Sequence, residues 1–227
     1  MHKRLVRGPE PGPDHCPVST GRLRYVLNQK VSPTIFLLRH GETEWNSRKR
    51  RQGRRNSLLT KRGVAQAVTC AKRLRHRISS CHSLTTISSP LGRAAQTASI
   101  VVEELGLPPE TIEYETSLME CSFGQWEGLT ENEIKRRFPQ EWEARCADRW
   151  NCPAPGGESY ADVHRRVSEW YLGKSFDGPV IIVGHGLTSR VFRGIYLGLS
   201  PQEVFALNEP QDGFIKLRDG HSTLIEH

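Results

Sequence analysis

The chain has 227 residues, of which 36% are hydrophobic, and it carries a formal net charge of +7. This length suits one α/β domain with a tail, and the hydrophobic content is sufficient for a core. No apolar stretch is long enough to cross a bilayer, and no secretory leader is apparent near the start. We therefore expect a cytoplasmic protein without a membrane partner.

Residues 1–33 are rich in proline, glycine and charge and show little periodicity. We expect this segment to be a disordered basic tail, and we place the folded domain at residues 34–227. The domain opens with the run 34–38, which is short, apolar and β-prone. Such a run predicts a strand that is covered on both faces.

The next segments alternate between helical and extended patterns. Thr60 is a candidate N-cap for a helix that runs to about residue 76, with apolar residues at helical spacing. Residues 84–87 predict a second strand. Pro90 opens a helix that ends near residue 105, and residues 111–114 predict a short strand.

The second half of the chain continues this alternation. Thr130 and Glu133 form a capping-box pattern for a helix over 134–138, and Ser159 precedes a helical segment at 163–170. The most strand-like segment, 179–183, is followed by a helical pattern at 187–197. Short strands are predicted at 214–217 and 223–225. Strands that alternate with helices predict an α/β fold, a three-layer sandwich whose mostly parallel sheet lies between helical layers.

Two of the predicted strands end in the same way. The first runs into Arg39, His40 and Gly41, and the strand at 179–183 runs into Gly184 and His185. Ligands of open parallel sheets bind at the carboxyl ends of the strands. If the two strands are neighbours, the two histidines face each other across one site. A single histidine in such a place would be interpreted as a turn or core residue, but two with an adjacent arginine indicate a site.

Several blocks of the sequence resemble the histidine phosphatase superfamily, which includes the cofactor-dependent phosphoglycerate mutases. The blocks occur in the family's order over residues 34 to 225, and five in order are far more specific than the triplet Arg-His-Gly alone. They are FLLRHGETEWN at 36–46, SSPLGRAAQTA at 88–98, LME to GQWEG at 118–128, PGGES at 155–159 and VGHG at 183–186.

The resemblance implies a role for each of four residues. His40 would attack phosphorus as a neutral imidazole and form a phosphohistidine. Arg39 and Arg93 would clamp the phosphoryl oxygens, which suits the planar guanidinium better than lysine. His185 would donate to the transferring oxygens. Because these groups supply the positive charge, we expect neither a metal nor a cofactor.

The proton donor is expected among the acids of the third block. Gly186 stands where the acid-phosphatase branch has an aspartate, which places the chain in the mutase-like branch and favours Glu120 as the donor. Glu127 is a rival. We also expect the side chains of Asn46, Gln52 and Thr43 to donate to phosphate, with Gly186 among the phosphate-binding positions, although such polar residues also serve as turn or cap residues.

The surroundings of Glu120 favour a phosphatase over a mutase. In the mutases, which the chain resembles in its core, an arginine follows this glutamate and a long basic insertion holds a second phosphate. Here Cys121 follows, and only about thirty residues separate Glu120 from Gly156. We therefore predict hydrolysis of a small phosphorylated metabolite, with a mutase as the alternative; the resemblance also allows a homodimer.

The basic residues are concentrated in the tail and in the run 48–55, and the rest of the chain is slightly acidic. A local basic patch steers anions, so the run could line the mouth of a phosphate site or could be a solvated loop. Nucleic-acid binding is not expected, because no recognised motif accompanies the run. A phospholigand-binding module without catalysis remains a second alternative from another class. The six cysteines lack CxxC spacing and are expected to be reduced thiols.

Overall fold

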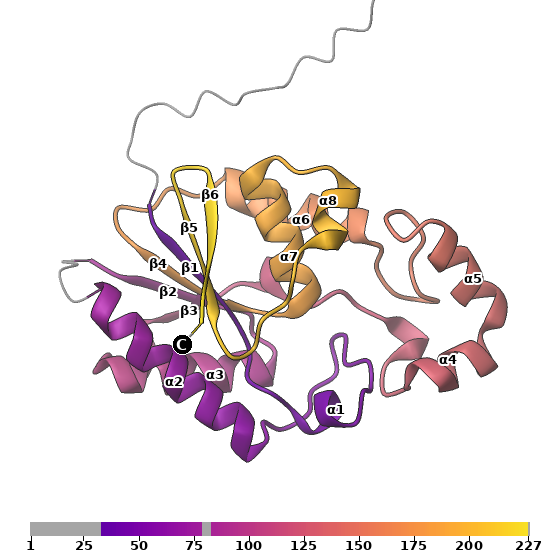
Figure 1. Ribbon diagram of the computed structural model, residues 1–227, viewed down its shortest axis with the longest axis horizontal. Coiled ribbons are helices and arrows are strands. Elements are labelled where there is room, and N and C mark those ends of the chain that lie inside the picture. The colour runs from indigo at the N-terminus through magenta and orange to yellow at the C-terminus, as the bar shows by residue number, and fades with distance from the viewer. Residues whose placement is uncertain (1–32, 79–82, 227) are drawn as a thin grey trace, which may run out of the picture. The chain divides into compact units, whose positions relative to one another are not determined.

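A six-stranded sheet with the order β3-β2-β4-β1-β5-β6 organises the computed structural model (Figure 1). The structure describes residues 33–78 and 83–226, so the predicted tail lies outside the described residues except for residue 33. β3, β2, β4 and β1 are parallel, whereas β5 and β6 pair antiparallel. The strands are β1 Ile35–Arg39, β2 Thr85–Ser88, β3 Ile112–Tyr114, β4 Val180–Gly184, β5 Phe214–Arg218 and β6 His221–Ile225.

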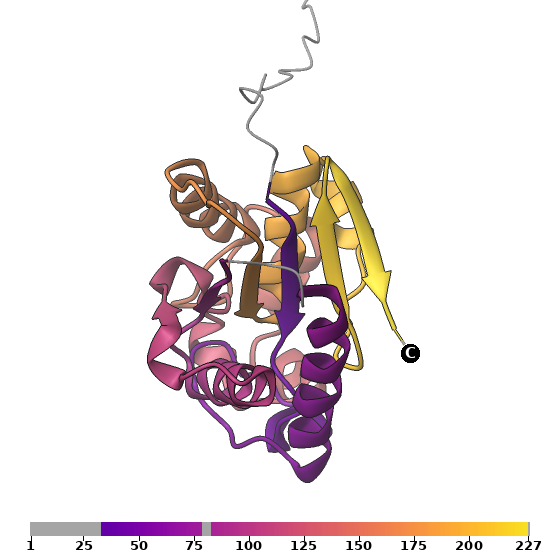
Figure 2. The same cartoon turned by 90° about the vertical axis from the view of Figure 1, so that its left-hand side faces the viewer.

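Helices cover both faces of this sheet. α2 and α3 pack on one face, and α6 and α7 pack on the other (Figure 1). The antiparallel pair β5–β6 forms one edge of the sheet (Figure 2). The helices are α1 Glu44–Ser47, α2 Lys61–Ile78, α3 Gly92–Leu105, α4 Glu131–Arg137, α5 Pro139–Ala147, α6 Tyr160–Leu172, α7 Gly186–Leu197 and α8 Pro201–Ala206, with short 3-10 turns at Pro109–Thr111, Thr116–Leu118 and Gly124–Trp126.

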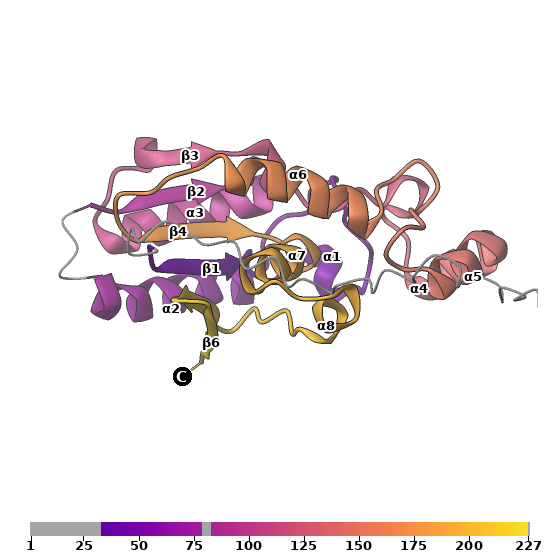
Figure 3. The ribbon, with the colours of Figure 1, turned by 90° about the horizontal axis from the view of Figure 1, so that it is seen from above.

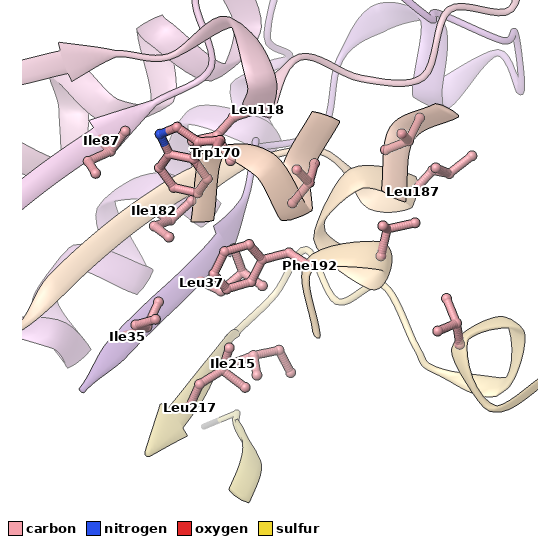
Figure 4. Packing of buried hydrophobic residues seen from close by; sticks show 14 of the residues in the cluster. Ile35, Leu37, Ile87, Leu118, Trp170, Ile182, Leu187, Phe192, Ile215 and Leu217 are labelled. Atoms are coloured by element: carbon pink, nitrogen blue, oxygen red, sulfur yellow. The ribbon is translucent and has the colours of Figure 1, made fainter. Parts of the chain in front are cut away.

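Strand β1 shows why the sheet needs two helical layers. Successive side chains of a strand point to opposite faces, so Ile35 and Leu37 pack with α6 and α7 while Phe36 and Leu38 pack with α2 and α3. Figure 4 shows the first of these two cores, with Leu37 near Phe192 of α7. A strand buried on both faces reads as a continuous apolar run, as the sequence predicted.

Helices α4 and α5 lie beyond the ends to which β1 and β4 point (Figure 3). They close a small third core of Trp126, Ile134 and Ala154, against which Phe138 and Trp142 pack. Phe138 ends α4 and also precedes Pro139, the first residue of α5. The segment that contains α4 and α5 thus lies outside the three-layer sandwich, past the carboxyl ends of β1 and β4.

The α/β sandwich and its main elements are confirmed. The capping boxes of Thr130 and Ser159 are present, and the Thr60 hydroxyl accepts the Gly63 amide at the start of α2. The helix expected at 134–138 lies instead at Glu131–Arg137, and α1, α5 and α8 were not predicted. Over residues 33–78 and 83–226, no helix combines the length and the hydrophobicity needed to span a membrane.

Candidate active site

Histidines 40 and 185 meet because their strands are paired in register. β1 and β4 run parallel with Arg39 opposite Gly184, and the His40 amide donates to the Gly184 carbonyl at 3.0 Å. Each histidine is therefore the first residue past its strand. Their ring centroids are 5.3 Å apart, so the structure brings together the pair that the sequence singled out.

The His40 ring is held in a defined protonation state. It is buried, and burial together with the positive charges of Arg93 and Arg39 lowers its pKa well below the ordinary value. Nδ1 lies 2.7 Å from the Gly41 carbonyl oxygen, which can only accept, so Nδ1 carries the proton. Nε2 is then the unprotonated nitrogen, and it accepts a hydrogen bond from Arg93 Nε at 3.2 Å. A neutral imidazole with an available lone pair is a competent nucleophile.

Arg93, on the first turn of α3, is fixed by backbone carbonyls. Nη1 donates to the Arg55 carbonyl and Nη2 to the Gly53 carbonyl, each at 2.7 Å. Burial lowers its pKa to about 10, so the side chain remains a cation near neutral pH. Its Nε–Nη2 edge is the side that faces His40, and such an edge can bind two oxygens of one phosphoryl group.

Arg39 approaches the same place with part of its hydrogen-bonding capacity unused. Nη1 donates to the Glu209 carbonyl at 2.9 Å and lies 3.6 Å from the Glu209 carboxylate. Nε is buried and has no partner among the described residues. Buried donors are nearly always paired in native proteins, so Arg39 Nε is a donor suited to a ligand oxygen.

His185 is fully buried beside His40, where burial and then the charge of Arg93 lower its pKa well below the ordinary value. Nε2 contacts the Ser89 hydroxyl at 2.7 Å, while Nδ1 has no partner in the described part of the chain. If the Ser89 hydroxyl donates to Nε2, the ring proton lies on Nδ1. The next residue is Gly186, where a Cβ would overlap the Glu209 carboxylate.

The two candidate acids have different surroundings. Glu120 lines the cavity at the start of α7, where its Oε1 accepts from the amides of Cys121 and Thr188. The Thr188 hydroxyl lies 3.0 Å from Oε1 and 2.8 Å from the Met119 carbonyl, and it has one proton to donate to one of them. Among the described residues, Glu120 Oε2 accepts only from the Leu187 amide. Glu127 is not part of the cavity lining; its Oε1 accepts from the amides of Arg54 and Phe123. Glu127 thus ties two loops together.

The three neutral candidates differ in position. Asn46 and Gln52 line the cavity, and the Gln52 Oε1 atom is buried without a partner among the described residues. Thr43 is the N-cap of α1, and its hydroxyl bonds with Asn46. The cavity lining does not include Thr43, and it does not include His185 or Gly186 either. Turning the Gln52 amide over would present its NH2 group instead.

These residues surround a cavity of about 590 Å³ at the carboxyl edge of the sheet. Arg39, His40, Arg93 and Glu120 belong to its lining, as do the aromatic residues Phe123, Trp126 and Trp142. Arg39 Nε and His185 Nδ1 are buried and have no partner among the described residues. Among the described residues, no group of three His, Cys, Asp or Glu has a geometry for a metal ion.

Several residues at the site were not predicted. Ser89 contacts His185, Glu209 pairs with Arg39 and with Arg190, and Arg145 and Tyr160 line the cavity. Only Ser89 belonged to a block that resembles the family. Glu209 and Arg145 carried no sequence signal, because their positions depend on how the segments after α4 and α8 fold back to the sheet.

The basic run 48–55 is largely neutralised. Each of its five arginines has a carboxylate partner: Arg48 pairs with Glu44, Arg50 with Glu133, Arg51 with Glu131, Arg54 with Glu158 and Arg55 with Glu127. Arg50 and Arg51 also line the cavity, as expected for a mouth residue, whereas Arg48, Arg54 and Arg55 do not. Exposed pairs of this kind add little to stability.

Burial raises the pKa of the Cys70 thiol to about 11 and that of Cys121 to about 12. A thiol with so high a pKa is not a nucleophile near neutral pH. Cys70, Cys121, Cys146 and Cys152 form no disulfide with one another.

The sequence profile of the histidine phosphatase superfamily (branch 1) matches residues 35–219. A 2,3-bisphosphoglycerate-dependent phosphoglycerate mutase from Chelativorans sp. (strain BNC1) is 30% identical over 180 residues, which cover 77% of this chain and 86% of the relative. The mouse 6-phosphofructo-2-kinase/fructose-2,6-bisphosphatase 1 is 32% identical over 194 residues, covering 85% of this chain but only 39% of that longer protein.

Two solved structures match the fold. A putative α-ribazole-5′-phosphate phosphatase from Escherichia coli aligns with a TM-score of 0.73 at 23% identity, over 86% of this chain and 95% of that one. A mycobacterial glucosyl-3-phosphoglycerate phosphatase in complex with VO3 aligns with a TM-score of 0.68 at 30% identity, over 85% and 97% of the two chains. The similar proteins thus include phosphatases and mutases.

Proposed function

Because the chain belongs to the histidine phosphatase superfamily, branch 1, we propose that it hydrolyses phosphate monoesters through a phosphohistidine on His40. One observation carries this proposal. The unprotonated Nε2 of His40 accepts from Arg93 Nε in a cavity that Arg39 also lines, and its Nδ1 proton is held by the Gly41 carbonyl. An imidazole nucleophile of defined tautomer, in a cavity lined by two guanidinium groups, suits attack on a phosphoryl group.

In the first step the Nε2 lone pair attacks phosphorus, a P–N bond forms and the P–O bond to the leaving group breaks. Arg93 Nε leaves Nε2 and donates with Nη2 to the phosphoryl oxygens, and Arg39 Nε does the same from the other side. His185 Nδ1–H supplies a further donor when Ser89 donates to its Nε2. These fixed donors stabilise charge that develops on the oxygens, without a need to reorganise.

Glu120 is the proposed proton donor to the leaving oxygen. Its Oε1 already accepts two backbone hydrogen bonds and its Oε2 one, so Oε2 is the oxygen with more capacity to carry a proton. In the second step water attacks phosphorus, the Glu120 carboxylate takes a proton from that water, and the P–N bond breaks. Inorganic phosphate and neutral His40 are regenerated, and no metal ion or cofactor takes part.

A phosphatase is preferred to a mutase because of the residues that come after Glu120 in the chain. The mutases, by resemblance, have an arginine at the next position, where this chain has the buried Cys121, whose thiol contacts the Glu158 carbonyl. The short helices α4 and α5 lie in the interval that, by resemblance, a basic insertion occupies in mutases. The chain offers less to retain a doubly phosphorylated intermediate.

The test is hydrolysis of 4-nitrophenyl phosphate by the full chain, with and without EDTA, beside His40→Ala. We expect release of phosphate that resists EDTA and that falls by at least about 10³-fold in His40→Ala, the scale found when an essential nucleophile is removed. A quench in alkaline detergent after mixing with a ³²P-labelled ester should trap label on wild type only, and that label should be stable in alkali and labile in acid.

Other outcomes would change the proposal. Isomerisation of 3-phosphoglycerate that requires bisphosphoglycerate, without net phosphate release, would establish the mutase. Tight binding of phosphate esters with no turnover of any ester would indicate a phospholigand-binding module. Hydrolysis that persists in His40→Ala would refute the phosphohistidine.

A further inference from the structure

One acidic side chain of the cavity lining lies beside the proposed phosphate site and has no part in the chemistry proposed at His40. Glu209 belongs to the segment between α8 and β5, and it lines the cavity together with Arg39. A carboxylate repels a phosphate dianion unless its charge is compensated. A glutamate at this position therefore works against phosphate affinity.

The Glu209 carboxylate is held between two arginines. Its Oε1 lies 2.7 Å from Arg190 Nη2, and its Oε2 lies 3.6 Å from Arg39 Nη1. Arg39 ends β1 and Arg190 belongs to α7, so the carboxylate connects the strand that leads to His40 with the helix that follows His185. None of the three side chains is more than 25% exposed, so solvent and salt screen these charges only in part.

The backbone of Gly186 fixes the place of this carboxylate. A Cβ at position 186 would overlap Glu209 Oε2 and would lie 3.4 Å from Arg39 Cζ. The carboxylate and the Arg39 guanidinium thus fill the space that a side chain at position 186 would take. Because Gly186 directly follows His185, the negative charge of Glu209 is placed at the edge of the proposed phosphate site.

Glu209 contacts Arg39 through its backbone as well as through its side chain. The Glu209 carbonyl accepts from Arg39 Nη1 at 2.9 Å, and the carboxylate approaches the same nitrogen. Arg39 Nε remains without a partner among the described residues and is free to donate to a phosphoryl oxygen. The backbone contact does not depend on the side chain at 209, so the carboxylate contributes mainly its charge.

The same carboxylate also compensates Arg190. Arg190 Nη2 pairs with Glu209, and Nη1 donates to the Tyr160 hydroxyl at 3.1 Å. The cavity lining includes Glu209 but not Arg190, so the anion of this pair is the member that faces the cavity. Without the carboxylate, Arg39 and Arg190 would be neighbouring cations, and a bound anion would be the group that compensates them.

We propose that Glu209 is a positioning residue whose negative charge, acting through Arg39 and Arg190, limits the affinity of the site for inorganic phosphate and so limits inhibition by the product. The inference rests on the proposed function, since phosphate is taken to be released at His40. Binding that stabilises the substrate, the product and the transition state equally does not raise kcat. A site with weaker affinity for free phosphate therefore loses no catalytic power and is less readily blocked by it.

Calorimetric titration of the full chain with inorganic phosphate tests this role. Glu209→Gln removes the charge but keeps an oxygen that can accept from Arg190. We expect the Kd for phosphate to fall by about 3- to 30-fold, the scale of one unit charge acting on a dianion across several ångströms of partly solvated protein. A variant with a merely disordered site would bind phosphate more weakly, so the direction of the change separates the two explanations.

Product inhibition gives a second readout, which reports only phosphate that competes at the active site. In 4-nitrophenyl phosphate hydrolysis, the inhibition constant of phosphate should fall in Glu209→Gln by the same factor as the Kd, while kcat/KM does not fall. Glu209→Asp keeps the charge on a shorter side chain and should return both constants to within about threefold of wild type. Glu209→Ala should change them in the same direction as Glu209→Gln, without an amide group against Gly186.

Glu131→Gln is the charge-matched control. Glu131 also lines the cavity, but its carboxylate lies 3.6 Å from Arg51 and 2.7 Å from Lys135. Its Kd for phosphate should stay within about twofold of wild type. An equal fall in Glu131→Gln would mean that the total charge of the cavity sets phosphate affinity, and would overturn the proposal. Unchanged or weaker phosphate binding in both Glu209→Gln and Glu209→Ala would overturn it too.

The titration also separates this inference from the proposed function, because phosphate binding needs no turnover. Tighter binding in Glu209→Gln would support the role of Glu209 even if the enzyme proved to be a mutase. Unchanged binding in Glu209→Gln would refute that role, while 4-nitrophenyl phosphate hydrolysis that depends on His40 would leave the phosphatase proposal standing.

Discussion

Glu120 and Glu127 illustrate how surroundings, more than residue type, assign a role to a side chain. Both belong to the same block of sequence, yet only Glu120 borders the cavity, with Oε2 accepting a single hydrogen bond. The Glu127 carboxylate is occupied by the amides of Arg54 and Phe123 and by Arg55. The sequence favoured Glu120, and the geometry supplies a physical reason for that preference.

Replacing Glu120 by glutamine should slow hydrolysis in a way that depends on the leaving group. An alkoxide needs a proton as the P–O bond breaks, whereas 4-nitrophenolate leaves without one. We expect Glu120→Gln to reduce kcat/KM by about 10²- to 10⁴-fold for an alkyl phosphate, and by about tenfold or less for 4-nitrophenyl phosphate. The measurement is steady-state kinetics with a series of esters of rising leaving-group pKa, in which the slope of log kcat/KM against that pKa is compared between the variant and wild type.

Glu127→Gln provides the comparison. Its loss loosens the loops that it joins and should lower all rates by a similar factor, so the slope against leaving-group pKa stays that of wild type. A parallel loss across the series in Glu120→Gln would mean that Glu120 only positions the start of α7 and that another group donates the proton.

At the scale of elements, the loop that follows β1 and helix α2 are in backbone contact. A Cβ on Gly63, in the first turn of α2, would overlap the carbonyl oxygen of Glu42, and a Cβ on Gly41 would overlap the Gly63 carbonyl. The Gly41 carbonyl also accepts the Nδ1 proton of His40. A change in this contact is therefore transmitted to the His40 ring through the backbone.

We expect Gly63→Ala to destabilise the protein by about 1–3 kcal/mol, because backbone atoms cannot give way as a side chain can. It should also lower kcat by displacing Gly41 and the ring that it orients. Urea unfolding and 4-nitrophenyl phosphate kinetics measure the two effects. Gly173→Ala is the control, since Gly173 has a φ of −83° and only ordinary contacts. Gly63→Ala with the stability and kcat of the control would contradict this argument.

The elements that the sequence predicted are those with local signals. Apolar runs covered on both faces and capping boxes such as Thr130 with Glu133 located β1, β4 and α4. Helix α8 carries similar signals, Ser200 with Glu203 and Pro201 at its start, and could have been predicted from them. Helix α5 follows α4 without a linker, and its course depends on Trp142 packing against Trp126, which is a tertiary contact that no local pattern encodes.

The residues of the candidate site also fall into those that the sequence could predict and those that it could not. His40, Arg39 and His185 could be placed because parallel strands end at one edge of a sheet, and Arg93 and Glu120 because of the family blocks. Arg145, Arg149 and Glu209 could not, since the course of helix α5, which carries Arg145, and of the segments that carry Arg149 and Glu209 depends on tertiary packing. Thr43 shows the opposite case, in which a residue of the signature block serves as a helix cap outside the lining.

At the scale of the whole molecule, formal charge is a poor guide to function. The net charge of +7 suggested a basic protein, but the run 48–55 is paired with acids from several elements. The cavity lining contains six arginines and three glutamates, so this concave site has an excess of positive charge of its own. Charge held in a concave, partly buried place attracts small anions more effectively than a solvated patch.

Burial of His40 and His185 also makes the stability of the whole fold depend on pH. Both are buried with pKa values well below the ordinary value, chiefly because of burial and then the charge of Arg93. In the unfolded chain each titrates near pH 6.5. Below that pH the unfolded chain binds protons that the folded protein does not, so their contribution to stability is complete above pH 6.5 and is lost as pH falls toward the folded pKa values.

We expect the free energy of unfolding to fall by about 2–3 kcal/mol between pH 7.5 and pH 5.5 from these two groups together. Urea denaturation in phosphate-free buffers measures it, because phosphate bound at the site would oppose the loss. The double variant His40→Gln/His185→Gln should lose most of this dependence, whereas His221→Gln, which alters an exposed imidazole, should keep it. The same slope in wild type and the double variant would show that acid destabilisation arises elsewhere, and that the two buried rings accept protons in the folded state as readily as in the unfolded chain.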